Sequence, residues 1–188
     1  MANPFDAIDF GTAVPEPWDF ETGVTLGAGF RCSRGEFVSY WKQGRVQREC
    51  DARIARAFAL QSDGRLAAYM TLFADKLHAS EPLLHEQQIR YRTFPAMKIG
   101  LLAADKRARG AGTRLVKWAL GYCAFEVGAL TGVRFVTVDA LFDADTGFDA
   151  SPFYEKLGFR FASPGDTDPP QDGYRTMYFD LKPLYTTL

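Results

Sequence analysis

Residues 97 to 127 read MKIGLLAADKRARGAGTRLVKWALGYCAFEV, and this stretch decides the fold. The apolar run from Ile99 to Ala104 is typical of a buried strand. A charged turn with Gly110 and Gly112 follows, and apolar residues then recur three and four positions apart from Leu115 onwards, which predicts a helix. In a strand–turn–helix segment with a glycine-rich turn, the unpaired backbone N–H groups at the beginning of the helix point towards one place. The stretch therefore predicts a phosphate-binding loop.

A second motif, SPFYEKLGF, occupies residues 151 to 159. Pro152 suits the first turn of a short helix, and Gly158 ends that helix before a new strand. Between the two motifs, the segment from Val133 to Leu141 is apolar and rich in strand-forming residues, so it predicts another buried strand.

The spacing Arg107-x-x-Gly110-x-Gly112 resembles the loop with which GCN5-related N-acetyltransferases (GNAT proteins) bind the pyrophosphate of coenzyme A. SPFYEKLGF resembles the second signature of that family, and the two motifs stand in the family's order. The resemblance covers the chain from about Lys98 to Phe161. It implies an α/β (α+β) GNAT fold: a mixed, mostly antiparallel twisted sheet of about six or seven strands, with helices on both faces and central strands splayed to admit acetyl-CoA.

By this resemblance, acetyl-CoA is the cofactor, and backbone groups of the loop and of the preceding strand bind it. The implied binding residues are Leu102, Ala103, Arg107, Arg109, Gly110, Ala111, Gly112 and Thr113. Either Lys106 or Lys156 would meet the adenosine phosphate. The alternative interpretation is a plain helix cap with surface arginines.

Tyr154 is the predicted catalytic residue, because a phenol can protonate the departing thiolate and the matching tyrosine of relatives lies at the sulfur. The alternative is a core aromatic residue, as expected of its neighbour Phe153. No general base is predicted, although five residues were weighed for that role: His78, Glu81, His85, Glu86 and Asp139.

The composition indicates an ordinary globular protein: 188 residues, 47% hydrophobic and 24% charged, with a net charge of −1. We expect an extended N-terminal arm at residues 1–19 and a single acetyltransferase domain at residues 20–188. The acidic balance argues against a dedicated nucleic-acid binder. No membrane span, secretory signal or metal-ligand spacing is present, and three scattered cysteines favour reduced thiols in a cytoplasmic protein.

The arm is expected to pack through Phe5, Phe10 and Trp18. A capping box from Ser33 to Glu36 predicts the start of a first helix. The remaining expected elements are a strand at 20–26, a helix at 45–50, a hairpin of strands 53–61 and 66–77, a connector at 78–93 with a helix at 80–88, and a last strand at 174–181. If that last strand were exposed, it could pair across a homodimer.

Residues 142 to 150 read FDADTGFDA, but their acidic spacing does not fit a calcium loop, so no metal site is predicted. The preferred function is an acetyl-CoA-dependent N-acetyltransferase that acts on a primary amine of a small molecule or peptide. The order of elements from Phe30 to Leu72 is also similar to the toxin branch of the family, which acetylates aminoacyl-tRNA. A catalytically idle acyl-CoA-binding domain is the third interpretation.

Overall fold

The computed structural model describes residues 3–18, 20, 29–78, 83–168 and 172–185. The chain divides into two compact units, the first formed by residues 1–73 and 100–119 and the second by residues 74–99 and 120–188. Strands β3 (Arg65–His78) and β4 (Thr93–Ala104) and helix α3 (Ala111–Tyr122) contribute residues to both units.

The first unit is built on the strand order β1-β2-β3-β4. Its other elements are β1 (Glu16–Pro17), α1 (Gly35–Lys42), α2 (Arg45–Asp51) and β2 (Arg56–Ser62). The pairs β1/β2 and β2/β3 are antiparallel, which confirms the predicted hairpin. Asp63 and Gly64 both have a positive φ, as a tight hairpin turn requires.

Helices cover both faces of the sheet in this unit. Ala57 and Ala59 of β2 lie in a core cluster with Trp41 of α1. Phe58, between them, packs against Trp118 of α3 with the ring centroids 4.8 Å apart. Because successive strand residues point to opposite faces, α1 and α3 lie on different sides of β2, as the sequence predicts.

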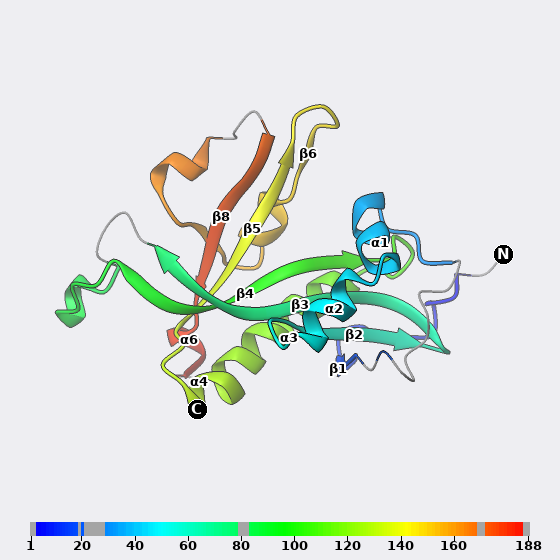
Figure 1. Cartoon of the computed structure of the whole chain (residues 1–188), viewed down its shortest axis with the longest axis horizontal. Helices are drawn as coiled ribbons and strands as arrows, with labels where there is room; N and C mark the ends of the chain where they lie inside the picture. Colours follow the sequence, from blue (N-terminus) through cyan, green and yellow to red (C-terminus); the bar gives the residue numbers. More distant parts are fainter. Residues whose placement is uncertain (1–2, 19, 21–28, 79–82, 169–171, 186–188) are drawn as a thin grey trace. The chain divides into compact units, whose positions relative to one another are not determined.

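The second unit has the strand order β4-β5-β8-β7, with β6 paired to β5. Its strands and helices are α4 (Gly128–Leu130), β5 (Phe135–Asp143), β6 (Phe148–Asp149), α5 (Ser151–Glu155), β7 (Arg160–Phe161), β8 (Asp172–Asp180) and α6 (Lys182–Tyr185). A π-helical turn, Cys123–Val127, joins α3 to α4, and 3-10 turns form at His85–Gln87 and Pro164–Thr167. In Figure 1, β5 and β8 lie side by side and β6 folds back along β5.

The pairing pattern confirms a mixed, mostly antiparallel sheet. β4 and β5 are parallel, while β5/β6, β5/β8 and β7/β8 are antiparallel. The parallel ladder runs from the pair Ala96–Phe135 to the pair Ile99–Val138, all within the second unit. The splaying of the central strands stays a prediction. The chain has eight strands in the described residues, and three of them are only two residues long.

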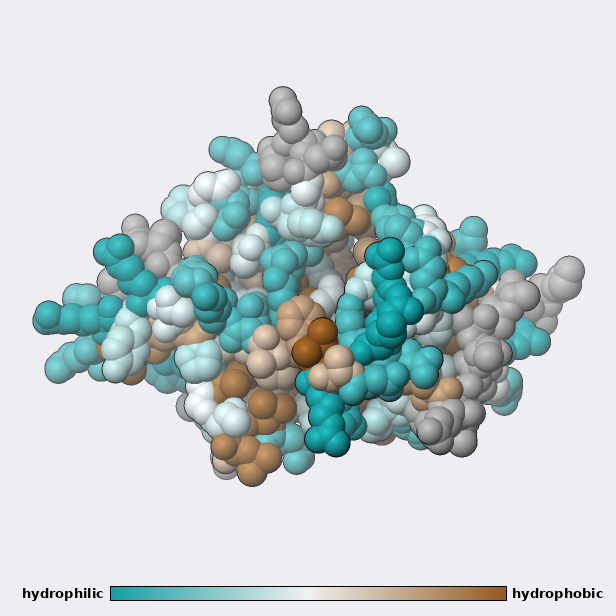
Figure 2. All heavy atoms as spheres, viewed as in Figure 1, coloured by the Kyte–Doolittle hydropathy of each residue, from teal (hydrophilic) through white to brown (hydrophobic). Residues whose placement is uncertain are grey.

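The second unit also carries an apolar surface patch made by Phe125, Leu130 and Tyr185, which are 44%, 88% and 39% exposed. These residues belong to the π-helical turn and to α4 and α6, and both helices contact that turn. Figure 2 shows brown, apolar spheres gathered over this region. Among the described residues, every helix is too short or too polar to cross a bilayer.

Several local predictions are wrong. Helix α1 begins at Gly35 without a side-chain cap, because Glu36 pairs with Arg34 instead of completing a capping box with Ser33. The described part of the connector forms a 3-10 turn at His85–Gln87 in place of a helix reaching Gln88. The strand predicted at 20–26 lies almost wholly outside the described residues.

The last strand is not at an edge of the sheet. β8 pairs with β5 on one side and with β7 on the other, where Met177 and Tyr178 oppose the two β7 residues. The condition attached to the homodimer, an exposed last strand, is therefore not met along the two residues of β7, and the homodimer itself stays a prediction. The N-terminal arm forms hydrogen-bonded turns between Asn3 and Ala13, so this part of it is not extended, while the bounds of the arm and of the domain stay predictions.

Candidate functional site

The loop between β4 and α3 belongs to the first unit. The buried carboxylate of Asp105 fixes its conformation by hydrogen bonds. Asp105 is 1% exposed and directly follows β4. It accepts hydrogen bonds from the backbone N–H groups of Arg31 and Arg107 at 2.8 and 2.9 Å, and from Nε of Arg107 at 2.8 Å. Burial alone would raise the pKa of Asp105, but these hydrogen bonds outweigh it and lower the pKa.

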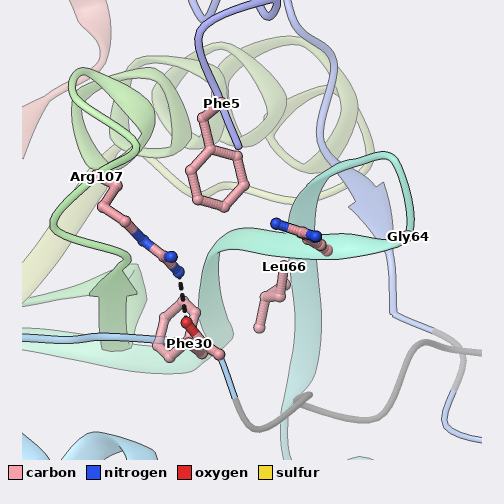
Figure 3. Close-up of a pocket in the computed structure, with 7 residues that line it drawn as sticks. Phe5, Phe30, Gly64, Leu66 and Arg107 are labelled. Carbon is pink, nitrogen blue, oxygen red and sulfur yellow. Dashed lines mark hydrogen bonds between the residues drawn. The ribbon is translucent and has the colours of Figure 1, made fainter. Parts of the chain in front are cut away.

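The side chain of Arg107 makes contacts that hold the loop in its conformation. Its guanidinium donates to Asp105 and to the carbonyl of Gly29, and it lies over the ring of Phe5 at 5.7 Å. Figure 3 shows this side chain between Phe5 and Phe30, at one wall of a pocket of about 310 Å³. The backbone N–H of Arg107 also donates to Asp105, so the backbone N–H, Nε and Nη2 are all engaged, and Arg107 fixes the turn of the loop.

Four of the predicted binding residues present open backbone N–H groups. Within the described part of the chain, the amides of Arg109, Gly110, Gly112 and Thr113 have no hydrogen-bond acceptor. The amide of Ala111, by contrast, donates to the carbonyl of Ala108 at 3.1 Å. The first turn of α3 has no acidic residue, so the positive end of the helix dipole is not offset there.

The two glycines leave room beside these donors. Gly110 has a φ of +91°, and a Cβ added there would meet only the Phe10 Cβ, at 3.9 Å. A Cβ on Gly112 would meet only the Ala104 Cβ, at 3.7 Å. A backbone with free donors and no covering side chain can bind a phosphate closely, since an anion needs direct approach to the N–H groups.

The end of β4 brings its backbone close to β3. The N–H of Leu101 donates to Oγ1 of Thr71 at 2.9 Å, so a side chain replaces the usual carbonyl acceptor. A Cβ on Gly100 would overlap the Phe73 ring and Oγ1 of Thr71, so a larger residue there would require these side chains to shift. The predicted residues Leu102 and Ala103 follow directly, half-buried and buried respectively.

Tyr154 belongs to the second unit, in α5. It is 7% exposed, and its ring packs edge-on against Phe153 and Phe159, at centroid distances of 5.0 and 5.4 Å. Its hydroxyl has no hydrogen-bond partner among the described residues, and it is not among the fully buried atoms that lack one. Burial raises the pKa of Tyr154, so the phenol stays protonated at neutral pH.

Two of the residues considered as general base, Asp139 and His78, already have partners. Asp139 is ion-paired with Lys98 and accepts a hydrogen bond from Oγ1 of Thr176 at 3.2 Å. His78 contacts Oγ1 of Thr93 at 3.1 Å. Glu81 lies outside the described residues, and Lys156 is exposed just after α5.

The acidic segment after β5 is organised by an arginine. Asp149 pairs with Arg175, which is 5% exposed and also bonds Oγ of Ser151. No group of three or more potential metal ligands occurs in the part of the chain that the structure describes. All three cysteines are free thiols, and burial raises the pKa of Cys123 to about 12.

Sequence reasoning missed the residues that shape the loop. Asp105 carried one available signal, since a carboxylate directly after an apolar strand and two residues before Arg107 is well placed to cap the turn. The contribution of Asn3, whose Nδ2 donates to the carbonyl of Arg107 at 3.1 Å, had no signal, because the two residues are far apart in the sequence.

No family model and no curated protein matches this sequence. Solved structures do match. The crystal structure of a tyrosine-to-phenylalanine mutant of KacT superposes with a TM-score of 0.74 at 21% identity, over 93% of this chain and 98% of that chain. AtaT complexed with acetyl-methionyl-tRNAfMet gives 0.71 at 19% identity, over 93% and 98%. The AtaT mutant toxin bound to the C-terminus of the antitoxin AtaR and acetyl-CoA gives 0.69 at 18%, over 93% and 97%.

The chain has the GNAT fold.

This likeness confirms the predicted fold class. The structures that show it are those of the KacT and AtaT toxins. In the GNAT fold of this chain, the loop from Asp105 to Thr113 and the end of β4 belong to the first unit, whereas Tyr154 and Lys156 belong to the second. The binding roles of these residues stay predictions.

Proposed function

We propose that this protein transfers the acetyl group of acetyl-CoA to the amino group of an aminoacyl-tRNA. The sequence alone favoured a small amine or a peptide as acceptor. The likeness to AtaT, solved with acetyl-methionyl-tRNAfMet, supports the tRNA-linked amine instead, since it extends over 93% of this chain. Similar likeness to AtaT bound to AtaR supports an antitoxin as a further partner.

The observation that carries the donor half of this proposal is the row of open amides at Arg109, Gly110, Gly112 and Thr113. Their number and their place at the start of a 12-residue helix suit the two phosphates of a diphosphate. The donor supplies an acetyl group activated as a thioester. Leu102 and Ala103, at the end of β4, would align the chain of the donor through their backbone groups.

The acetyl transfer forms one bond and breaks one. The neutral amine nitrogen bonds to the acetyl carbon, the carbon–sulfur bond breaks, the nitrogen loses a proton and the sulfur gains one. Tyr154 suits the last task, because its hydroxyl is protonated at neutral pH and has no partner among the described residues. No side chain is assigned as general base, since Asp139 is already ion-paired with Lys98.

A transfer assay tests the proposal. Purified protein is incubated with radiolabelled acetyl-CoA and a set of tRNAs, each charged with one amino acid, and the label on RNA is counted before and after hydrolysis of the aminoacyl ester. We expect label on charged tRNA, released as N-acetyl amino acid, and none on uncharged tRNA.

Two other outcomes would overturn the acceptor. Label on pooled small amines or peptides, with none on charged tRNA, would restore the acceptor that the sequence favoured. Tight acetyl-CoA binding with no acceptor labelled would indicate an idle acyl-CoA-binding domain. A Tyr154→Phe variant is the matched control, because it removes one oxygen and no hydrogen bond to the described residues.

A further inference from the structure

The N-terminal arm, residues 3–15, folds as a series of turns that ends in the sheet. The amides of Asp6 and Ile8 donate back to the carbonyls of Asn3 and Phe5, at 3.3 and 3.2 Å. Further along, the N–H of Gly11 donates to the Asp9 carboxylate at 2.8 Å. The arm then enters β1, which pairs with β2, so its far end is fixed to the first unit.

Four contacts join this arm to the loop and to the first turn of α3. Asn3 Nδ2 donates to the carbonyl of Arg107, and the Phe5 ring lies under the Arg107 guanidinium. The Cβ of Phe10 lies beside Gly110, and Nε of Arg114 donates to the carbonyl of Ala13. These contacts span the whole stretch from 107 to 114.

The contacts are specific and sheltered. Phe5 is 4% exposed and Phe10 is 8% exposed, with their ring centroids 6.4 Å apart. The amide of Asn3 is fixed at both ends, because its Oδ1 accepts from the N–H of Phe5 while its Nδ2 holds the loop. Figure 3 shows Phe5 reaching from the arm towards Arg107.

We propose that the arm is a positioning element of the donor site, which holds the loop so that the amides of residues 109 to 113 stay aligned for the diphosphate; this inference rests on the proposed function. The hydrogen bonds and the ring contact between the arm and this stretch use a carbonyl or a side chain, Phe10 lies beside the open space at Gly110, and none of these contacts uses an open amide. The arm therefore orders the loop without competing with the ligand.

The physical reason is the cost of ordering. Fixing the backbone of a glycine-containing loop costs conformational entropy, and a ligand that must order its own site binds more weakly. With the arm in place, the loop is already ordered when the protein folds, so ligand binding does not lose this entropy. Without it, the loop samples other conformations, and acetyl-CoA binds with lower affinity while turnover at saturation changes little.

Phe5→Ala and Asn3→Ala test the inference, with Val14→Ala as the matched control because Val14 lies on the same arm and is 68% exposed. The first measurement is hydrogen exchange, in the free protein, of the loop amides that are hydrogen-bonded within the loop, those of Arg107, Ala108 and Ala111. We expect exchange to be at least about tenfold faster in Phe5→Ala and about threefold faster in Asn3→Ala, and unchanged in the control.

The second measurement separates affinity from turnover. The KM for acetyl-CoA should rise by about tenfold in Phe5→Ala, with kcat within about twofold of the parent, and Phe5→Tyr should restore the parent KM because it keeps the ring under Arg107. A purely structural role would lower activity through the folded fraction and would leave KM unchanged.

The outcomes keep this inference apart from the proposed function. If the parent protein binds no acetyl-CoA, the proposed function fails, yet the exchange of the Arg107, Ala108 and Ala111 amides still decides whether the arm orders the loop. If the parent binds and both variants match it in exchange and in KM, the arm is not a positioning element. Should Phe5→Ala not fold, as judged by circular dichroism, Asn3→Ala alone decides.

Discussion

Replacing Asp105 with asparagine should lower the free energy of unfolding of the first unit by about 3 kcal/mol at pH 7. Asparagine keeps the shape but replaces one acceptor oxygen by an NH₂ group, which faces N–H donors from Arg31 or Arg107. Two charge-assisted hydrogen bonds are lost, at about 1.5 kcal/mol each. The guanidinium of Arg107 also loses its ion pair, so the figure is a lower bound.

Urea unfolding followed by tryptophan fluorescence measures this directly, because Trp18, Trp41 and Trp118 all belong to the first unit. The control is Asp63→Asn, at an exposed turn position where asparagine tolerates the positive φ. We expect the control to change the free energy by no more than about 0.5 kcal/mol.

The same pair of proteins should respond differently to acid. The pKa of Asp105 is lowered in the folded protein, so its contribution is fully present above the unfolded pKa of about 3.9 and disappears as the pH falls through the folded pKa. The gap between parent and Asp105→Asn should stay constant from neutral pH to about pH 5 and shrink below about pH 4. Equal stability at pH 7, or a gap that does not shrink in acid, would refute the role of Asp105.

The remaining predictions concern other groups. Tyr154→Phe should reduce kcat by about 100-fold or more with nearly unchanged acetyl-CoA affinity, and an unaltered kcat would remove Tyr154 from the mechanism. Gly110→Val should cost at least about 1 kcal/mol in backbone strain, seen in thermal unfolding, and should weaken acetyl-CoA binding in calorimetry. Arg175→Met should destabilise the protein by about 3 kcal/mol in urea, since it leaves Asp149 unpaired. Cys123 should react with iodoacetamide at pH 8 only after unfolding, as mass spectrometry can show, because burial raises its pKa to about 12.

The strongest predictions from sequence came from patterns that are local. The run from Ile99 to Ala104 and the turn after it were predicted as a strand and a loop, and the structure has β4 and α3 there. The hairpin around Asp63 was equally clear. In each case the residues that decide the conformation are neighbours in the chain.

The failures came from contacts between distant residues. The capping box at Ser33 is absent because Arg34 takes the carboxylate of Glu36, and a pattern cannot rank two such partners. The strand expected after Gly158 is β7, but its pairing with β8 joins residues far apart in the chain and has no signal in the sequence.

In the candidate site too, features set by neighbouring residues could be predicted, and features set by distant residues could not. The open amides of the loop follow from the positions of Gly110 and Gly112, which the sequence displays. The inward turn of Arg107 does not, because it depends on the carbonyl of Gly29 and on the ring of Phe5, and neither is near it in the chain.

Amide resonances of the free and ligand-bound protein test the central claim most directly. On titration with coenzyme A, the ¹H–¹⁵N signals of Arg109, Gly110, Gly112 and Thr113 should move downfield together and saturate, as expected for N–H groups that gain a charge-assisted hydrogen bond. The amides of Arg107 and Ala111, already bonded within the loop, should move less. Binding that leaves those four signals in place, or shifts confined to other parts of the chain, would contradict a diphosphate site at the start of α3.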